Sequence, residues 1–149
     1  MKSRRLAGLI ALVVGGMACA ESPRLELSVG MHRIDAEFAG DLSSRARGLM
    51  QRRQLAPQQG MLFAFPQDGR HCMWMRNTLI PLSVAFLDAE GRIINVERMA
   101  PRTENSHCAM APARFALEMN LGWFASRGLK TGDRIRGVAG LRAADAAYR

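Results

Sequence analysis

The sequence predicts a mainly β fold: a compact single domain of the sandwich or barrel type with one or two short helices. Three observations support this prediction. Short segments with apolar residues at every second position recur along the chain, glycine-containing turns separate them, and only two segments have helical periodicity. The length after the first 20 residues is enough for one hydrophobic core.

The first 20 residues have the pattern of a secretory signal peptide. A basic start is followed by an apolar run over residues 6–14 and by small residues up to Ala20. We therefore expect cleavage after Ala20 and soluble export to the periplasm of a bacterium. Lipidation of Cys19 is the alternative and would make the protein a lipoprotein held at the membrane. Gly16 stands where a lipoprotein signal carries a leucine-like residue, so soluble export is favoured.

The strand predictions follow the alternation of apolar residues. Residues 24–29 and 32–38 both alternate, and Gly30-Met31 lies between them, so we expect an N-terminal hairpin within residues 21–41. Residues 89–91 are expected to form a second hairpin turn, because a three-residue connection that contains glycine is typical of hairpins. Further strands are expected at residues 61–65, 71–77, 83–88, 92–99, 115–120 and 133–138.

Residues 41–55 are predicted to form a helix. Asp41 or Ser43 can cap its first turn. Gly48 in mid-helix costs about 1 kcal/mol relative to alanine, so another backbone or a ligand is expected to approach there. The apolar stripe consists of Leu42, Ala46, Leu49 and Met50.

Two segments complete the expected structure near the C-terminus. Residues 121–128 are predicted to form one or two helical turns that end at Gly128. Residues 139–149 are expected to be a frayed tail.

The charge of the chain narrows the expected partners. The 21 Lys+Arg exceed the 13 Asp+Glu, which gives a formal net charge of +8. Cleavage after Ala20 would remove Lys2, Arg4 and Arg5 and leave a charge of +5. An exported protein with this charge meets anionic small molecules or glycans more readily than nucleic acid. We therefore expect such a ligand and no nucleic-acid partner. We also expect the protein to be a monomer.

The chain resembles a known family. The ordered blocks "RGLMQR", "GMLFAFP", "WMRNTLIPL", "AFLDAEGRI", "MAP", "ALEMNLGWF" and "GLKTGDRI" resemble those of the exported members of the DUF192 family, also called UPF0127. The resemblance runs over residues 42–138 and implies a compact, mostly β domain with a short helix near its start. It implies no activity and no cofactor. Ser83 stands where the family pattern usually has aspartate, so no carboxylate role is expected there.

Cys72 and Cys108 are predicted to form a disulfide. After export they are the two remaining cysteines, in an oxidising compartment. The bond would stabilise the fold by roughly 4 kcal/mol in the chain-entropy model. Two buried reduced thiols are one alternative, and a copper-handling site that adds His71 and His107 is another. Because neighbouring strand residues point to opposite faces, His71 and Cys72 cannot both face one ion without a bulge, and no metal is expected.

The predicted ligand site combines two groups of residues. Trp74 suits stacking on a flat or sugar-like ligand, and Arg76 beside it suits an anionic group. Trp74 could equally be a core aromatic, and Asn77 a turn residue. In the second group, Glu118 is a carboxylate in an apolar segment, which is expensive unless it is paired. Arg47 would either form a buried ion pair with it or line a ligand cleft beside it. The expected ligand-binding residues are Arg47, Trp74, Arg76, Asn77 and Glu118.

Nothing in the sequence indicates a particular catalytic chemistry. A nucleophile elbow, a zinc-protease motif and a phosphate-binding loop are all missing. No catalytic residue is therefore assigned. The expected function is an exported module that binds a small molecule or glycan. The alternative is an envelope hydrolase in which Glu118 or Asp88 acts with His107.

Overall fold

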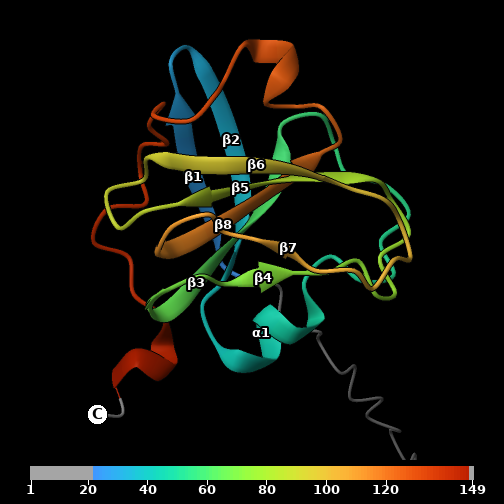
Figure 1. Ribbon diagram of the computed structural model, residues 1–149, viewed down its shortest axis with the longest axis horizontal. Helices are drawn as coiled ribbons and strands as arrows, with labels where there is room; N and C mark the ends of the chain where they lie inside the picture. Colours follow the sequence, from blue (N-terminus) through green and yellow to red (C-terminus); the bar gives the residue numbers. More distant parts are fainter. Residues whose placement is uncertain (1–21, 148–149) are drawn as a thin grey trace, which may run out of the picture.

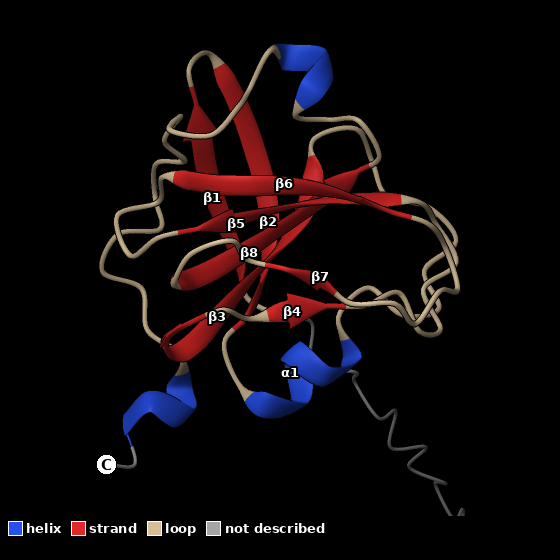
Figure 2. Cartoon of the chain, in the orientation of Figure 1, coloured by secondary structure: helices blue, strands red, loops and turns tan. Residues whose placement is uncertain are grey.

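The computed structural model describes residues 22–147 and confirms the mainly β prediction (Figures 1 and 2). The expected signal peptide and Cys19 lie outside the described residues. Within residues 22–147, no helix is long and apolar enough to cross a membrane.

Most of the chain forms one six-stranded sheet. Its order is β1-β2-β3-β8-β5-β6, and every neighbouring pair is antiparallel except β2 and β3. A two-stranded sheet pairs β4 with β7. The strands are β1 Arg24–Val29, β2 His32–Ala39, β3 Gln59–Gly69, β4 Cys72–Met73, β5 Leu82–Leu87, β6 Ile93–Met99, β7 His107–Cys108 and β8 Ala113–Asn120. The helices are α1 Leu42–Arg47 and two 3-10 turns, η1 Ala125–Arg127 and η2 Ala144–Ala147.

Each face of the large sheet carries its own apolar core. One core contains Trp123, Phe124 and the segment around Ile135. The other contains Leu49 and Met75, which follow α1 and β4 in the chain. Because β2 and β3 run parallel, the chain must cross over between them, and α1 lies in that crossover. Figure 1 shows α1 and β4 on the same side of the sheet.

The segment at residues 133–138 is not the strand that the alternation predicts. It forms single bridges instead, from Arg136 to Ser28 of β1 and from Arg134 to Arg92 just before β6. Gly132 and Gly137 have positive φ angles of 94° and 96°, which turn the chain on both sides of these bridges. The segment thus connects the two edge strands, which gives the open sheet its barrel-like character.

α1 is shorter than predicted. Asp41 caps it by accepting a hydrogen bond from the backbone N–H of Ser44, and the helix ends at Arg47. Gly48 then adopts φ 47° and ψ −136°, a conformation that a helix cannot contain. The predicted apolar stripe is wrong for Leu42, which is 72% exposed, and for Ala46, which is also exposed. Leu49 is buried, but it follows the end of the helix.

Residues 71–77 do not form one strand. Only Cys72 and Met73 are extended, and Asn77 has a φ of 56°, so the chain turns where the sequence predicts a continuing strand. Their partner β7, His107–Cys108, is a strand that the sequence analysis did not predict.

The predicted frayed tail is also corrected in part. Residues 144–147 form η2, and the Asp145 carboxylate accepts hydrogen bonds from the guanidinium of Arg45 in α1. A bidentate contact of this kind attaches the tail to the helix.

Candidate functional site

Three glutamates lie in one row across the large sheet. Glu118 of β8 is opposite Met61 of β3 on one side and Val84 of β5 on the other. Met61 is opposite Glu37 of β2, and Val84 is opposite Glu97 of β6. Residues directly opposite each other share a face of the sheet, so the three carboxyl groups lie on the face that also carries Leu49 and Met75. The sequence analysis identified only Glu118.

The two outer glutamates have partners. Glu37 accepts two hydrogen bonds from the Arg52 guanidinium, at 2.5 and 2.6 Å, and it also pairs with Arg24. Glu97 accepts a 3.4 Å hydrogen bond from the Asn95 side-chain amide and lies 3.8 Å from Nδ1 of His107. Glu37 is therefore paired with a cation, and Glu97 has a hydrogen-bond donor.

Glu118 differs from both. Its side chain makes no hydrogen bond and no ion pair with any described residue, and it is 3% exposed. Burial raises the pKa of this carboxyl from 4.5 to about 8. Glu118 is therefore mainly protonated at pH 7, and its carboxyl group is a hydrogen-bond donor without an acceptor.

A cavity of about 30 Å³ lies against Glu118. This volume is enough for one or two water molecules. Its walls come from the sheet, from the end of α1 and from the chain after β4. They include Arg47, Gly48, Phe63, Met73, Trp74 and Thr78. The structure thus brings together three of the five predicted ligand-binding residues: Arg47, Trp74 and Glu118.

Trp74 and Arg47 have exposed side chains beside this cavity. Trp74 is 47% exposed, whereas the core tryptophan is Trp123 at 3%. The alternative that Trp74 is a central core residue is therefore wrong. Arg47 is also exposed and makes no ion pair with Glu118, so the predicted buried ion pair between them does not form. The pairing of a buried glutamate with arginine occurs instead at Glu37.

The other two predicted residues, Arg76 and Asn77, line a separate surface depression of about 310 Å³. Arg76 pairs with Glu104 at 3.4 Å, and its Cζ lies 5.6 Å from the centre of the Trp74 ring. The segment at residues 74–78 therefore contributes to both hollows. The remaining residues of the depression are Gln51, Leu79, Arg102 and Glu104.

Among the described residues, no hydrogen bond or ion pair joins His107 to Glu118 or to Asp88. Asp88 accepts hydrogen bonds from the backbone N–H groups of Glu90 and Arg92, as a turn residue does. It lies four residues along the chain from Val84, the neighbour of Glu118, which is about 13 Å in an extended strand. His107 contacts Glu97 instead.

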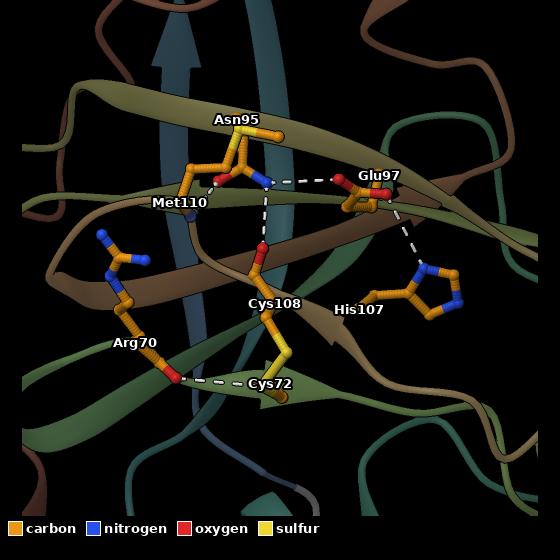
Figure 3. Close-up of a disulfide and its surroundings, with 7 residues drawn as sticks. All are labelled: Arg70, Cys72, Asn95, Glu97, His107, Cys108 and Met110. Atoms are coloured by element: carbon orange, nitrogen blue, oxygen red, sulfur yellow. Dashed lines mark hydrogen bonds and ion pairs between the residues drawn. A yellow bond between two sulfur atoms is a disulfide. The ribbon is translucent and has the colours of Figure 1, made fainter.

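Cys72 and Cys108 form the predicted disulfide, with their Cα atoms 4.0 Å apart (Figure 3). They are directly opposite each other in the β4–β7 pair. The copper alternative would need both thiols, and the bond removes them. His71 stacks on Phe65 instead, with ring centres 3.8 Å apart. Residues 22–147 contain no group of three or more His, Cys, Asp or Glu side chains placed to hold a metal ion.

Asn95 ties the β4–β7 pair to the large sheet. Its amide donates a 3.1 Å hydrogen bond to the carbonyl of Cys108, and its oxygen accepts one from the backbone N–H of Met110 (Figure 3). This contact holds β7, and through the disulfide β4, over the face that carries Glu118. Sequence reasoning missed Asn95, although a polar residue inside the apolar strand "RIINVERM" is a usable signal.

Gly48 forms part of the cavity wall, and its conformation requires glycine. A Cβ atom there would lie 3.3 Å from the Phe63 ring, at a φ of 47°. We expect Gly48→Ala to lower the free energy of unfolding by about 1–3 kcal/mol, because alanine is strained in this backbone region. Chemical denaturation would measure this loss. Gly128→Ala is a comparison for positive φ with open space around it, and it should cost less, because Gly128 has the left-handed helical conformation (φ 67°, ψ 19°) that alanine tolerates better.

The fold and its hollows define a small mainly β domain with an unpaired buried carboxyl group beside a surface that carries aromatic and basic side chains. The chain belongs to the DUF192 family, described as "Uncharacterized ACR", whose model matches residues 25–137.

Two solved structures are similar to it. One is titled a "putative transcription regulator" from Sinorhizobium meliloti 1021, with 37% identity and a TM-score of 0.71 over 76% of this chain and 92% of that one. The other, a protein of unknown function from Novosphingobium aromaticivorans DSM 12444, has 30% identity and a TM-score of 0.74 over 87% of this chain and 93% of that one. No curated protein matches the chain.

Proposed function

We propose that the protein is an exported, periplasmic and monomeric domain that binds a small anionic molecule or glycan on the surface beside the Glu118 cavity, with one polar group of the ligand entering that cavity. The observation that carries this proposal is the unpaired Glu118 carboxyl, buried against a cavity that Arg47 and Trp74 also line. A buried polar group without a partner costs free energy in the empty protein, and a ligand that supplies the partner recovers that cost. The basic and apolar start of the sequence supports export, and Cys19 leaves lipid attachment as the second form of export.

Each of the three side chains has a distinct role in this proposal. The protonated Glu118 donates a hydrogen bond to a ligand oxygen. Arg47 attracts negative charge on the ligand, since its guanidinium is exposed and has no carboxylate partner among the described residues. Trp74 offers an exposed ring against which a sugar or planar group can pack.

D-glucuronate and N-acetylglucosamine are suitable first probes, because one is an anionic sugar and the other is neutral. We expect D-glucuronate to change the Trp74 fluorescence and N-acetylglucosamine to do so less. The change should disappear in Trp74→Phe, which leaves the buried Trp123 as the remaining tryptophan. Arg47→Gln should weaken D-glucuronate binding about tenfold, and Arg33→Gln, which removes another exposed charge, should not.

The pH dependence of binding gives a second readout. Because the pKa of Glu118 is about 8, wild-type affinity for D-glucuronate should fall as the pH rises through 8. Glu118→Gln keeps a donor that does not ionise and should lose this dependence. If neither sugar perturbs Trp74, or if Trp74→Phe responds as the wild type does, the proposed site is wrong.

The Sinorhizobium relative is described as a transcription regulator, which raises a role in transcription for this chain. In residues 22–147 of this chain, the one α-helix has six residues. Helix-turn-helix proteins place a longer recognition helix in the major groove of DNA. The small-ligand proposal therefore has more support, and titration with duplex DNA at 150 mM salt serves as a control that we expect to be negative.

A further inference from the structure

We propose that the depression between Arg76 and Arg102 binds a phosphate group. This inference deepens the proposed function. It rests on that function for one claim only: the phosphate and the group that reaches the Glu118 cavity are parts of the same ligand.

Two arginines from separate segments line this depression. Arg76 comes from the turn after β4 and Arg102 from the turn after β6. Two backbone hydrogen bonds fix these turns to each other, from Met75 N–H to the Thr103 carbonyl and from Arg102 N–H to the Thr78 carbonyl, both at 3.0 Å. The two arginines are therefore held on one rigid part of the surface.

The backbone at the depression is unusual. Among residues 22–147, three non-glycine residues have positive φ: Gln51 at 62°, Asn77 at 56° and Arg102 at 58°. All three line this depression. Non-glycine residues with positive φ are uncommon, and such strain is often found where a binding site requires it. The N–H of Gln51 donates to the Asn77 carbonyl at 2.9 Å, so these turns support one another.

The chemistry of the lining favours phosphate over carboxylate. One guanidinium already satisfies the two oxygens of a carboxylate, whereas phosphate has three terminal oxygens and carries about −1.5 to −2 charges at pH 7. Two guanidiniums and the side-chain amides of Asn77 and Gln51 match these oxygens and this charge. Glu104 is the competing anion in the empty site, since it pairs with Arg76 at 3.4 Å while both side chains remain more than half exposed.

The position of Arg76 connects this depression to the proposed ligand site. Its guanidinium lies over the Trp74 ring, and Trp74 lines the Glu118 cavity. A phosphate at Arg76 would therefore lie beside the group that packs on Trp74. A phosphate ester of a sugar has the required two parts.

Calorimetric titration at low ionic strength and pH 7, with inorganic phosphate and with glucose 1-phosphate, tests the inference. Arg76→Gln and Arg102→Gln should each weaken phosphate binding about tenfold, the effect of losing one charge-assisted pair. Glu104→Gln should strengthen it severalfold, because the competing carboxylate is removed. The matched controls Arg33→Gln and Glu90→Gln change the net charge equally at exposed positions away from the depression and should leave the affinity unchanged.

The outcomes separate this inference from the proposed function. Equal weakening by Arg33→Gln and Arg76→Gln, or no measurable phosphate binding, would overturn the phosphate site. Glu118→Gln should leave inorganic phosphate binding unchanged even if the Glu118 cavity binds nothing. Tighter binding of glucose 1-phosphate than of phosphate, lost in Trp74→Ala, supports one shared ligand. If inorganic phosphate and glucose 1-phosphate bind with equal affinity, the two hollows do not share one ligand, and the depression is a site for free phosphate.

Discussion

Replacing both Cys72 and Cys108 by serine is expected to lower the free energy of unfolding by about 4 kcal/mol. The two cysteines are 36 residues apart in sequence, and a bond across a loop of this length restricts the unfolded chain by that amount in the chain-entropy model. This is a large fraction of the total stability of a small domain. Urea denaturation of the wild type and the double variant measures the difference.

The structure also predicts where the loss acts. β4 and β7 have two residues each, so the short ladder between them depends on the disulfide, and the Asn95 contact attaches it to the large sheet. Hydrogen exchange at residues 72–76 should therefore accelerate in the double variant more than exchange in the central strand β8.

Reduction gives the matched control. Adding a reductant to the wild type should reproduce the loss, and adding it to the double variant should change nothing. The prediction is wrong if the reduced wild type, with both thiols shown to be free, has the same free energy of unfolding as the oxidised wild type.

The hairpins were predictable because their signals are local. The alternation in β1 and β2 and the turn at Gly30 all lie within 16 residues, and the structure shows that hairpin at the predicted place. The β5–β6 hairpin follows the same logic around Gly91. In contrast, apolar residues alternate equally well in residues 71–77, but the strand ends at Met73. The backbone N–H of Met75 donates a hydrogen bond to the carbonyl of Thr103, which lies in a turn far away in the sequence. Alternation says nothing about such a contact.

The candidate site was predictable only in part, for a similar reason. Glu118 stands out in the sequence because a carboxyl group in an apolar strand must be paired or must serve a ligand. Its alignment with Glu37 and Glu97 depends on the register of five strands, and those two residues are 60 positions apart. The sequence therefore could not show that Arg52 is the arginine that pairs with a buried glutamate, or that this glutamate is Glu37.

The buried Glu118 should make the protein less stable as the pH rises from about 5 to 8. Its pKa is raised from 4.5 to about 8 in the folded protein by burial. Between these two values the folded chain keeps the proton and the unfolded chain loses it, so unfolding releases a proton and higher pH favours it. At about 1.4 kcal/mol for each pH unit, the loss reaches roughly 5 kcal/mol and levels off above pH 8.

Glu118→Gln isolates this effect, because glutamine has nearly the same shape and does not ionise. The variant and the wild type should have similar stability at pH 4.5, and the variant should be the more stable of the two at pH 9, by several kcal/mol. Urea denaturation across this pH range measures both curves. Glu97→Gln is the control, since Glu97 has partners in Asn95 and His107 and should leave the Glu118 slope in place.

The same titration distinguishes a structural Glu118 from a functional one. If the wild type and Glu118→Gln lose stability in parallel between pH 5 and pH 8, Glu118 is ionised in the folded protein, and the proposed hydrogen-bond donor does not exist. If the loss of stability with pH disappears in Glu118→Gln, glutamine at this position makes the protein more stable than the wild type above neutral pH. A ligand that accepts a hydrogen bond from the protonated Glu118 should stabilise the wild type most below pH 8 and raise the Glu118 pKa further. The loss of stability should therefore extend to higher pH when that ligand is bound, and this extension should be missing in Glu118→Gln.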